Sequence, residues 1–178
     1  MSRLESGLER LRLLDSALCI RVNGAVRVAP VRSVFRVVSR LGDGVFWYSL
    51  MVALLAAGGA AALGPVGRMA GTGLVCTLVY KWLKAKTLRP RPFTVENAVS
   101  AGADPLDPFS FPSGHTLHAV AFSIVAIAYY PALAWLLVPF TLLVAASRVV
   151  LGLHYPSDVL AGAALGALIA QGVLLITA

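Results

Sequence analysis

Three short polar clusters interrupt an otherwise apolar sequence, and they contain the side chains that could carry out chemistry. The clusters are Lys84 with Arg91-Pro92, Pro112-Ser113-Gly114-His115, and Ser147-Arg148 with His154 and Asp158. Together they supply three cations, two histidines, a hydroxyl, a glycine turn and a carboxylate. Cations neutralise a phosphate group and a histidine can attack it, so this inventory predicts phosphate-ester chemistry without a metal ion or other cofactor.

The order and spacing of the clusters resemble the three-part signature of the type 2 phosphatidic acid phosphatase superfamily, which includes membrane lipid phosphatases and the vanadium haloperoxidases. Lys84 lies seven positions before Arg91, whereas the neighbouring Arg89-Pro90 would need a lysine where the chain has Trp82. Five residues separate Arg148 from His154, and three separate His154 from Asp158. The resemblance covers about residues 45 to 178.

Each polar residue has an expected role in this chemistry. His154 is the candidate nucleophile, and Asp158, four residues on, is expected to fix its tautomer. The resemblance implies a phosphohistidine intermediate. His115 is the candidate general acid, which later activates water. The phosphate is expected to be held by three cations and by free backbone N–H groups at the start of a helix: Lys84, Arg91, Arg148, Ser113 and Gly114.

The same residue types also have structural interpretations. A histidine can cap a helix at the membrane interface, Pro-Ser-Gly is a common turn, and Lys or Arg at the end of a span often extends its charge into water. The register favours the chemical roles for the residues above. We apply the structural interpretation to Lys81, Lys86 and Arg89, which fall outside the register.

Three further polar residues could suggest a metal site, but other interpretations are favoured. His118 lies three residues after His115, and we expect it to pack or to support the site. Asp104 and Asp107 are expected to lie in a solvated loop between residues 92 and 112.

The composition predicts a membrane protein of one domain. Of 178 residues, 58% are hydrophobic and 13% are charged, and soluble domains carry about twice that charged fraction. The net charge is +7, and eight of the fifteen basic residues are arginines in the first forty positions. We expect these arginines to contact anionic lipid headgroups, not nucleic acid, because no aromatic residues for base stacking accompany them. Cys19 and Cys76 are isolated, so no disulfide is expected.

The apolar pattern predicts an all-α polytopic membrane bundle of about five transmembrane helices. Residues 1–44 are expected to form an amphipathic interfacial segment with helices over 3–20 and 31–41, and residues 45–178 the transmembrane domain. The expected spans are 45–63, 66–83, 113–130, 131–147 and 156–178. This topology places the N-terminus and all three clusters on one side of the membrane. Gly162 and Gly166 are expected to allow close helix packing within the chain.

These observations predict an integral membrane lipid phosphatase of the bacterial inner membrane. Candidate substrates are polyprenyl diphosphate, phosphatidic acid and phosphatidylglycerophosphate. Phe111-Pro112-Ser113 and the stretch from His154 to Gly162 resemble bacterial undecaprenyl-diphosphate phosphatases, which favours the first. A lipid phosphotransferase using the same histidine is the alternative, and a scaffold or transporter would not need the His115, His154 and Asp158 set.

The charge distribution and the family resemblance favour opposite sides of the membrane for the site. The basic residues gather on the face of the site, with only Arg68 opposite, which favours the cytoplasm. The resemblance implies a periplasmic site, and we adopt that expectation.

Overall fold

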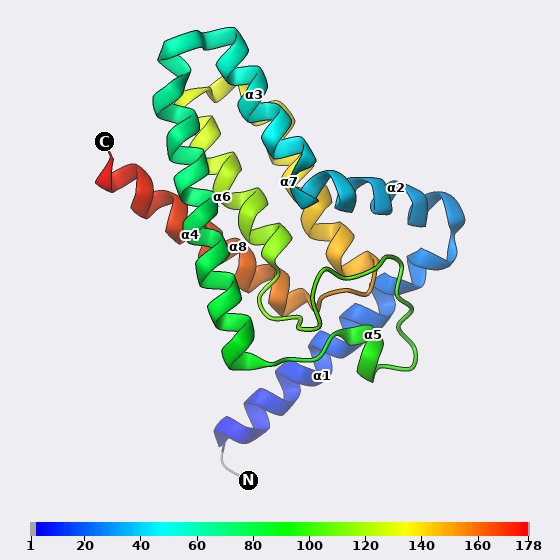
Figure 1. Ribbon diagram of the computed structural model, residues 1–178. Helices are drawn as coiled ribbons and strands as arrows, with labels where there is room; N and C mark the ends of the chain where they lie inside the picture. Colours follow the sequence, from blue (N-terminus) through cyan, green and yellow to red (C-terminus); the bar gives the residue numbers. More distant parts are fainter. Residues whose placement is uncertain (1–2, 178) are drawn as a thin grey trace.

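The computed structural model describes residues 3–177, whose regular structure is helical (Figure 1). Five helices of the described residues, α3, α4, α6, α7 and α8, form the bundle, and further helices lie before and between them. In chain order the elements are α1 (Arg3–Asn23), η1 (Gly24–Arg27), α2 (Ala29–Arg40), η2 (Leu41–Val45), α3 (Phe46–Gly58), η3 (Gly59–Ala62), α4 (Leu63–Thr87), α5 (Pro92–Val95), α6 (Gly114–Tyr129), η4 (Pro131–Leu133), α7 (Ala134–Val150) and α8 (Pro156–Ile176).

The apolar helices make this a polytopic membrane protein, as predicted. Within residues 3–177, three helical runs are long and apolar enough to cross a membrane, namely Ala29–Thr87, Pro131–Val150 and Pro156–Ile176, and Gly114–Tyr129 is a shorter apolar helix. The first run is not one rod, because the chain reverses direction at η3 and returns as α4 (Figure 1). The helix boundaries lie close to the predicted spans.

Helix α6 lies at the centre of the bundle and packs against α4, α7 and α8. Its closest neighbour is α8, because two glycines of α8 let the backbones touch. A Cβ atom at Gly162 would lie 2.6 Å from the Ser113 carbonyl oxygen, and one at Gly166 would come still closer to the carbonyl oxygen of Leu117. The two glycines therefore serve packing within the chain, as predicted.

Helix α1 turns its polar face toward the protein. Asp15, Cys19 and Asn23 follow one another at four-residue spacing and are buried. The Asn23 amide nitrogen donates to the carbonyl oxygens of Ser100 and Val150, each at 2.9 Å. Beside this buried stripe the helix exposes Leu11, Leu14, Leu18 and Val22, together with Arg10, Arg12 and Arg21. Exposed apolar and basic side chains suit a helix that lies on a membrane surface.

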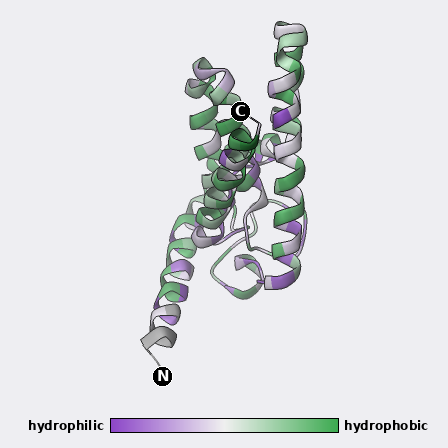
Figure 2. Cartoon of the chain, turned by 90° about the vertical axis from the view of Figure 1, so that its left-hand side faces the viewer, coloured by the Kyte–Doolittle hydropathy of each residue, from purple (hydrophilic) through white to green (hydrophobic). Residues whose placement is uncertain are grey.

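The two ends of the bundle differ in polarity. Figure 2 shows hydrophobic residues along the bundle helices and hydrophilic residues mostly toward the end with the loops and α1. At the other end, Arg68 donates to the hydroxyl and carbonyl oxygens of Thr177, at 2.8 and 2.6 Å. The three polar clusters meet at the loop end.

Candidate active site

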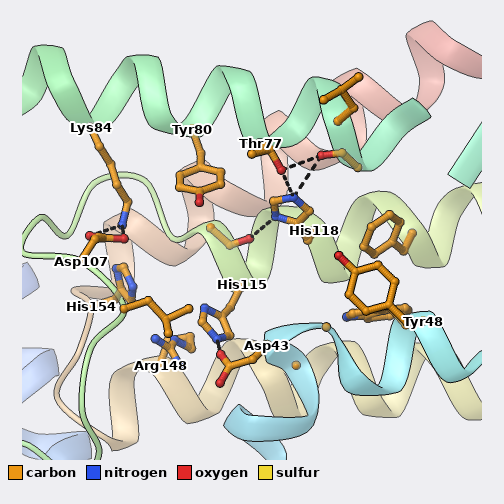
Figure 3. A pocket seen from close by; sticks show the side chains of 18 of the residues that line it. Asp43, Tyr48, Thr77, Tyr80, Lys84, Asp107, His115, His118, Arg148 and His154 are labelled. Atoms are coloured by element: carbon orange, nitrogen blue, oxygen red, sulfur yellow. Dashed lines mark hydrogen bonds and ion pairs between the residues drawn. The ribbon is translucent and has the colours of Figure 1, made fainter. Parts of the chain in front are cut away.

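A cavity of about 440 Å³ lies where the three clusters meet (Figure 3). Its polar end contains five of the predicted residues: Lys84, Arg91, His115, Arg148 and His154. Its other end runs between α3 and α4 and is lined by apolar side chains, among them Trp47, Met51, Ala70, Leu74 and Phe122. The cavity thus joins a cationic, histidine-containing pole to an apolar one.

His154 lies in the turn between α7 and α8, with only 1% of its surface exposed. The backbone N–H groups of Leu153 and His154 both donate to the Arg148 carbonyl oxygen, at 3.0 and 3.1 Å, which fixes the turn. The Nε2 atom of His154 is 3.3 Å from Nη1 of Arg91. Burial and the charges of Arg148 and Arg91 hold the pKa of His154 well below its ordinary value, so the ring stays neutral with a nucleophilic lone pair.

Asp158 lies beside His154, as the four-residue spacing predicted. Its Oδ2 atom is 3.6 Å from Nδ1 of His154, slightly beyond hydrogen-bond distance, and accepts the backbone N–H of Tyr155 at 2.9 Å. Arg89 donates to its Oδ1 atom at 2.6 Å. The carboxylate is fully buried and is held from both oxygens.

The prediction that Arg89 merely extends its charge into water is wrong. Arg89 bonds Asp158 through Nη1 and Asp15 of α1 through Nη2, at 2.6 and 2.7 Å. Its guanidinium carbon lies 4.1 Å from the centre of the Tyr155 ring. Burial opposes the charge, but the two carboxylates outweigh it and raise the pKa of Arg89 above its ordinary value. The sequence gives no sign that α1 delivers Asp15 to this position.

Lys84 and Arg91 are buried and share a carboxylate, that of Asp107. Nζ of Lys84 lies 2.7 Å from both oxygens of Asp107, and Nη2 of Arg91 lies 3.0 Å from Oδ1. The prediction that Asp107 is a solvated loop residue is therefore wrong, whereas Asp104 is exposed. Burial raises the pKa of Asp107, but the two cations lower it further, and the net pKa is below its ordinary value.

Arg148 completes the cationic pole from α7. It is buried, and its Nη1 atom donates to the hydroxyl of Ser39 in α2. Its Nε atom is buried without a hydrogen-bond partner in the described chain. An unpartnered buried donor costs about 1–3 kcal/mol, so the Nε–H group of Arg148 suits a bound anion.

His115 occupies the first turn of α6, and its Nε2 atom is hydrogen-bonded to the Asp43 carboxylate. Sequence reasoning missed Asp43, because residues 41–45 lie outside the three clusters. His118, one turn on, has its Nδ1 atom 2.8 Å from the Gly114 carbonyl oxygen and its Nε2 atom 3.1 Å from the Thr77 hydroxyl. His118 therefore packs between α4 and α6, and a supporting role in the chemistry stays a prediction. Residues 3–177 contain no group of three or more His, Cys, Asp or Glu side chains placed to hold a metal ion.

Ser113 and Gly114 differ in their relation to the cavity. Gly114 lines it. The Ser113 N–H donates to the Asp158 carbonyl oxygen at 3.0 Å, and its hydroxyl lies 3.0 Å from that of Thr116. The prediction of a free N–H at Ser113 is therefore wrong, because the close approach of α8 to α6 brings the Asp158 carbonyl to it.

Comparison with known proteins identifies relatives of this chain. The model of the PAP2 superfamily matches residues 49–178. Undecaprenyl-diphosphatase BcrC of Bacillus subtilis (strain 168) is 38% identical over 92 residues, which are 50% of this chain and 46% of that protein. The chain thus matches less than half the length of this curated relative.

Two solved structures share the fold. The crystal structure of Aquifex aeolicus LpxE has a TM-score of 0.78 and 25% identity, covering 89% of this chain and 93% of that one. The crystal structure of a PAP2-type phosphatidylglycerolphosphate phosphatase from Bacillus subtilis has a TM-score of 0.70 and 23% identity, covering 94% of this chain and 86% of that one. At this identity the likeness supports the fold alone. With a superfamily model that spans most of its length and places all three clusters inside the match, the chain belongs to the PAP2 superfamily.

Proposed function

We propose that this protein hydrolyses the phosphate or diphosphate headgroup of a membrane lipid through a phosphohistidine at His154. The observation that carries the proposal is the cavity with a cationic pole and an apolar pole. The cationic pole suits a phosphate, and the apolar pole between α3 and α4 suits a hydrocarbon chain. A water-soluble phosphate ester would leave the apolar pole unused.

The residues present suffice for each step of the reaction. Nε2 of His154 attacks phosphorus while the bond from phosphorus to the lipid oxygen breaks, and His115 supplies a proton to that oxygen. Lys84, Arg91 and Arg148 neutralise the charge on the phosphoryl oxygens. Water then attacks the phosphohistidine, His115 takes the proton of the water, and the phosphorus–nitrogen bond breaks.

Among the candidate lipids we favour a polyprenyl diphosphate. The support comes from the similarity to a protein named undecaprenyl-diphosphatase, together with the stretch from His154 to Gly162. Phosphatidic acid and phosphatidylglycerophosphate carry the same two parts, a phosphate and apolar chains. The enzyme is expected in the inner membrane of a bacterium, with its site on the periplasmic face.

The test is phosphate release from a panel of lipid phosphates by the purified protein in detergent. We expect inorganic phosphate from the wild type and none from His154→Ala, with Lys86→Ala as a matched control at an exposed cation of α4. Label that passes to a second lipid, without free phosphate, would identify a phosphotransferase. No product from any lipid phosphate would overturn the proposal.

A further inference from the structure

The short segment between α2 and α3 brings a carboxylate to the candidate general acid. Oδ1 of Asp43 pairs with Nε2 of His115. The Asp43 side chain is 23% exposed and that of His115 is 8% exposed, so the pair lies mostly out of water. Figure 3 shows Asp43 and His115 pointing toward one another, with Arg148 and His154 nearby.

The backbone of this segment is shaped for the contact. Residues 41–45 form a kink between the helices α2 and α3. Gly42 allows a close approach, because a Cβ atom there would lie 3.2 Å from the methyl groups of Val144 and 3.6 Å from Cδ2 of His115. Gly44 has φ +132°, a conformation that other residues rarely adopt. The sequence Gly-Asp-Gly thus turns the chain sharply and presents Asp43 to α6.

The charges around His115 make a counter-ion useful there. Burial is the largest factor that opposes a positive charge on the ring, followed by Arg148 from α7 and then by His118 one turn along α6. Asp43 is the carboxylate that pairs with the ring. A carboxylate hydrogen-bonded to one imidazole nitrogen fixes the tautomer and stabilises the protonated ring.

We propose that Asp43 is a positioning residue for acid–base catalysis: it holds the Nε2–H of His115 and directs Nδ1 to the leaving oxygen. This inference rests on the proposed function. In the first step the bond from His154 to phosphorus forms while the bond from phosphorus to the lipid oxygen breaks. The Nδ1 proton of His115 passes to that lipid oxygen. In the second step Nδ1 takes a proton from the attacking water as the phosphorus–nitrogen bond breaks. Asp43 remains a carboxylate throughout.

The leaving group separates this role from a purely structural one. An alkyl phosphate expels an alkoxide that needs a proton, whereas p-nitrophenyl phosphate expels a stable phenolate that does not. We expect Asp43→Asn to lower kcat/KM for a short-chain alkyl phosphate by about 10²-fold, the usual size of a general-acid contribution, and to leave p-nitrophenyl phosphate within about 3-fold of wild type. The control is Asp104→Asn, which removes an exposed carboxylate and should alter neither value.

Two further variants complete the experiment. His115→Asn should show the same selectivity, and adding Asp43→Asn to it should cause no further loss, because the two residues act as one unit. Asp43→Glu keeps the charge and should retain part of the alkyl-phosphate activity. This variant also tests the inference if Asp43→Asn does not fold.

Equal losses on both substrates, or no loss on either, would overturn the inference and leave the proposed function standing. A wild-type protein that hydrolyses neither ester nor any lipid phosphate would instead overturn the proposed function, and the inference with it.

Discussion

Arg89 donates to the Oδ1 atom of Asp158 at 2.6 Å, while the Oδ2 atom of the same carboxylate lies 3.6 Å from Nδ1 of His154. The carboxylate beside His154, the proposed nucleophile, is thus itself held by a cation from the loop after α4. Asp15 of α1 binds the same guanidinium at 2.7 Å. Residues from three separate parts of the chain therefore meet beside His154.

Removal of Arg89 is the first prediction. Arg89→Gln should lower turnover by about 10- to 100-fold, because Asp158 loses the partner that fixes it. It should also lower the free energy of unfolding by about 1–3 kcal/mol, since a buried carboxylate is left without its cation. Thermal unfolding in detergent and steady-state kinetics measure the two effects. Lys86→Gln is the matched control, and equal behaviour of the two variants would contradict this role.

The nucleophile is tested by trapping. Brief incubation of the wild type with a substrate labelled in its phosphate should leave acid-labile label on the protein, and His154→Ala should carry none. Asp158→Asn should fold and yet turn over more slowly by up to about 10⁴-fold, because the tautomer of His154 is no longer enforced. Substantial turnover by His154→Ala would assign the attack to another residue.

The contact between Asp107 and its two cations should depend on pH. Because Lys84 and Arg91 lower the pKa of Asp107 in the folded protein, their contact stabilises the fold above the ordinary aspartate pKa of about 3.9. That stabilisation is lost as the pH falls through the lowered value. The melting temperature of Asp107→Asn should therefore lie below that of wild type at neutral pH, and the difference should shrink in acid. A difference independent of pH would show that the charge of Asp107 does not matter.

Metal independence follows from the three cations that would neutralise the phosphate. Activity should survive incubation with EDTA, and vanadate should inhibit by mimicking pentacoordinate phosphorus. Phosphate release before and after dialysis against the chelator is the measurement. An enzyme that loses all activity in EDTA and regains it only with Mg²⁺ would require another mechanism.

The side of the membrane is tested through the C-terminus. Helix α8 leads away from the site, so a periplasmic site places the C-terminus in the cytoplasm. A C-terminal green fluorescent protein should therefore fluoresce, and a C-terminal alkaline phosphatase should be inactive. The opposite pair of results would mean that the arginines of the N-terminal segment obey the positive-inside rule.

The sequence predicted the parts of the fold and site that depend on local pattern. The lengths of the apolar stretches predicted the helices of the bundle. The register of the clusters predicted that five residues would meet, and all five line one cavity: Lys84, Arg91, His115, Arg148 and His154. Ser113 was misplaced because its N–H depends on how closely α8 approaches α6. That approach is a matter of tertiary packing.

Three of the carboxylates near the site were residues that sequence reasoning could not place. Asp15, Asp43 and Asp107 have no fixed spacing to the clusters, and each reaches its partner through the path of a loop or helix. A Gly-Asp-Gly stretch between two helical patterns was the one local signal for Asp43. The division of the chain at residues 44 and 45 stays a prediction.

The docking of α1 through its buried polar residues bears on which residues an active fragment of this protein must contain. The match to the superfamily begins at residue 49, after both Asp15 and Asp43. A chain cut at that boundary would retain every signature residue but lose Asp15, one of the two carboxylates that bind Arg89, and Asp43, which pairs with His115. We therefore expect the smallest active unit of this protein to be larger than its signature and to include α1, whose exposed leucines suit a lipid surface.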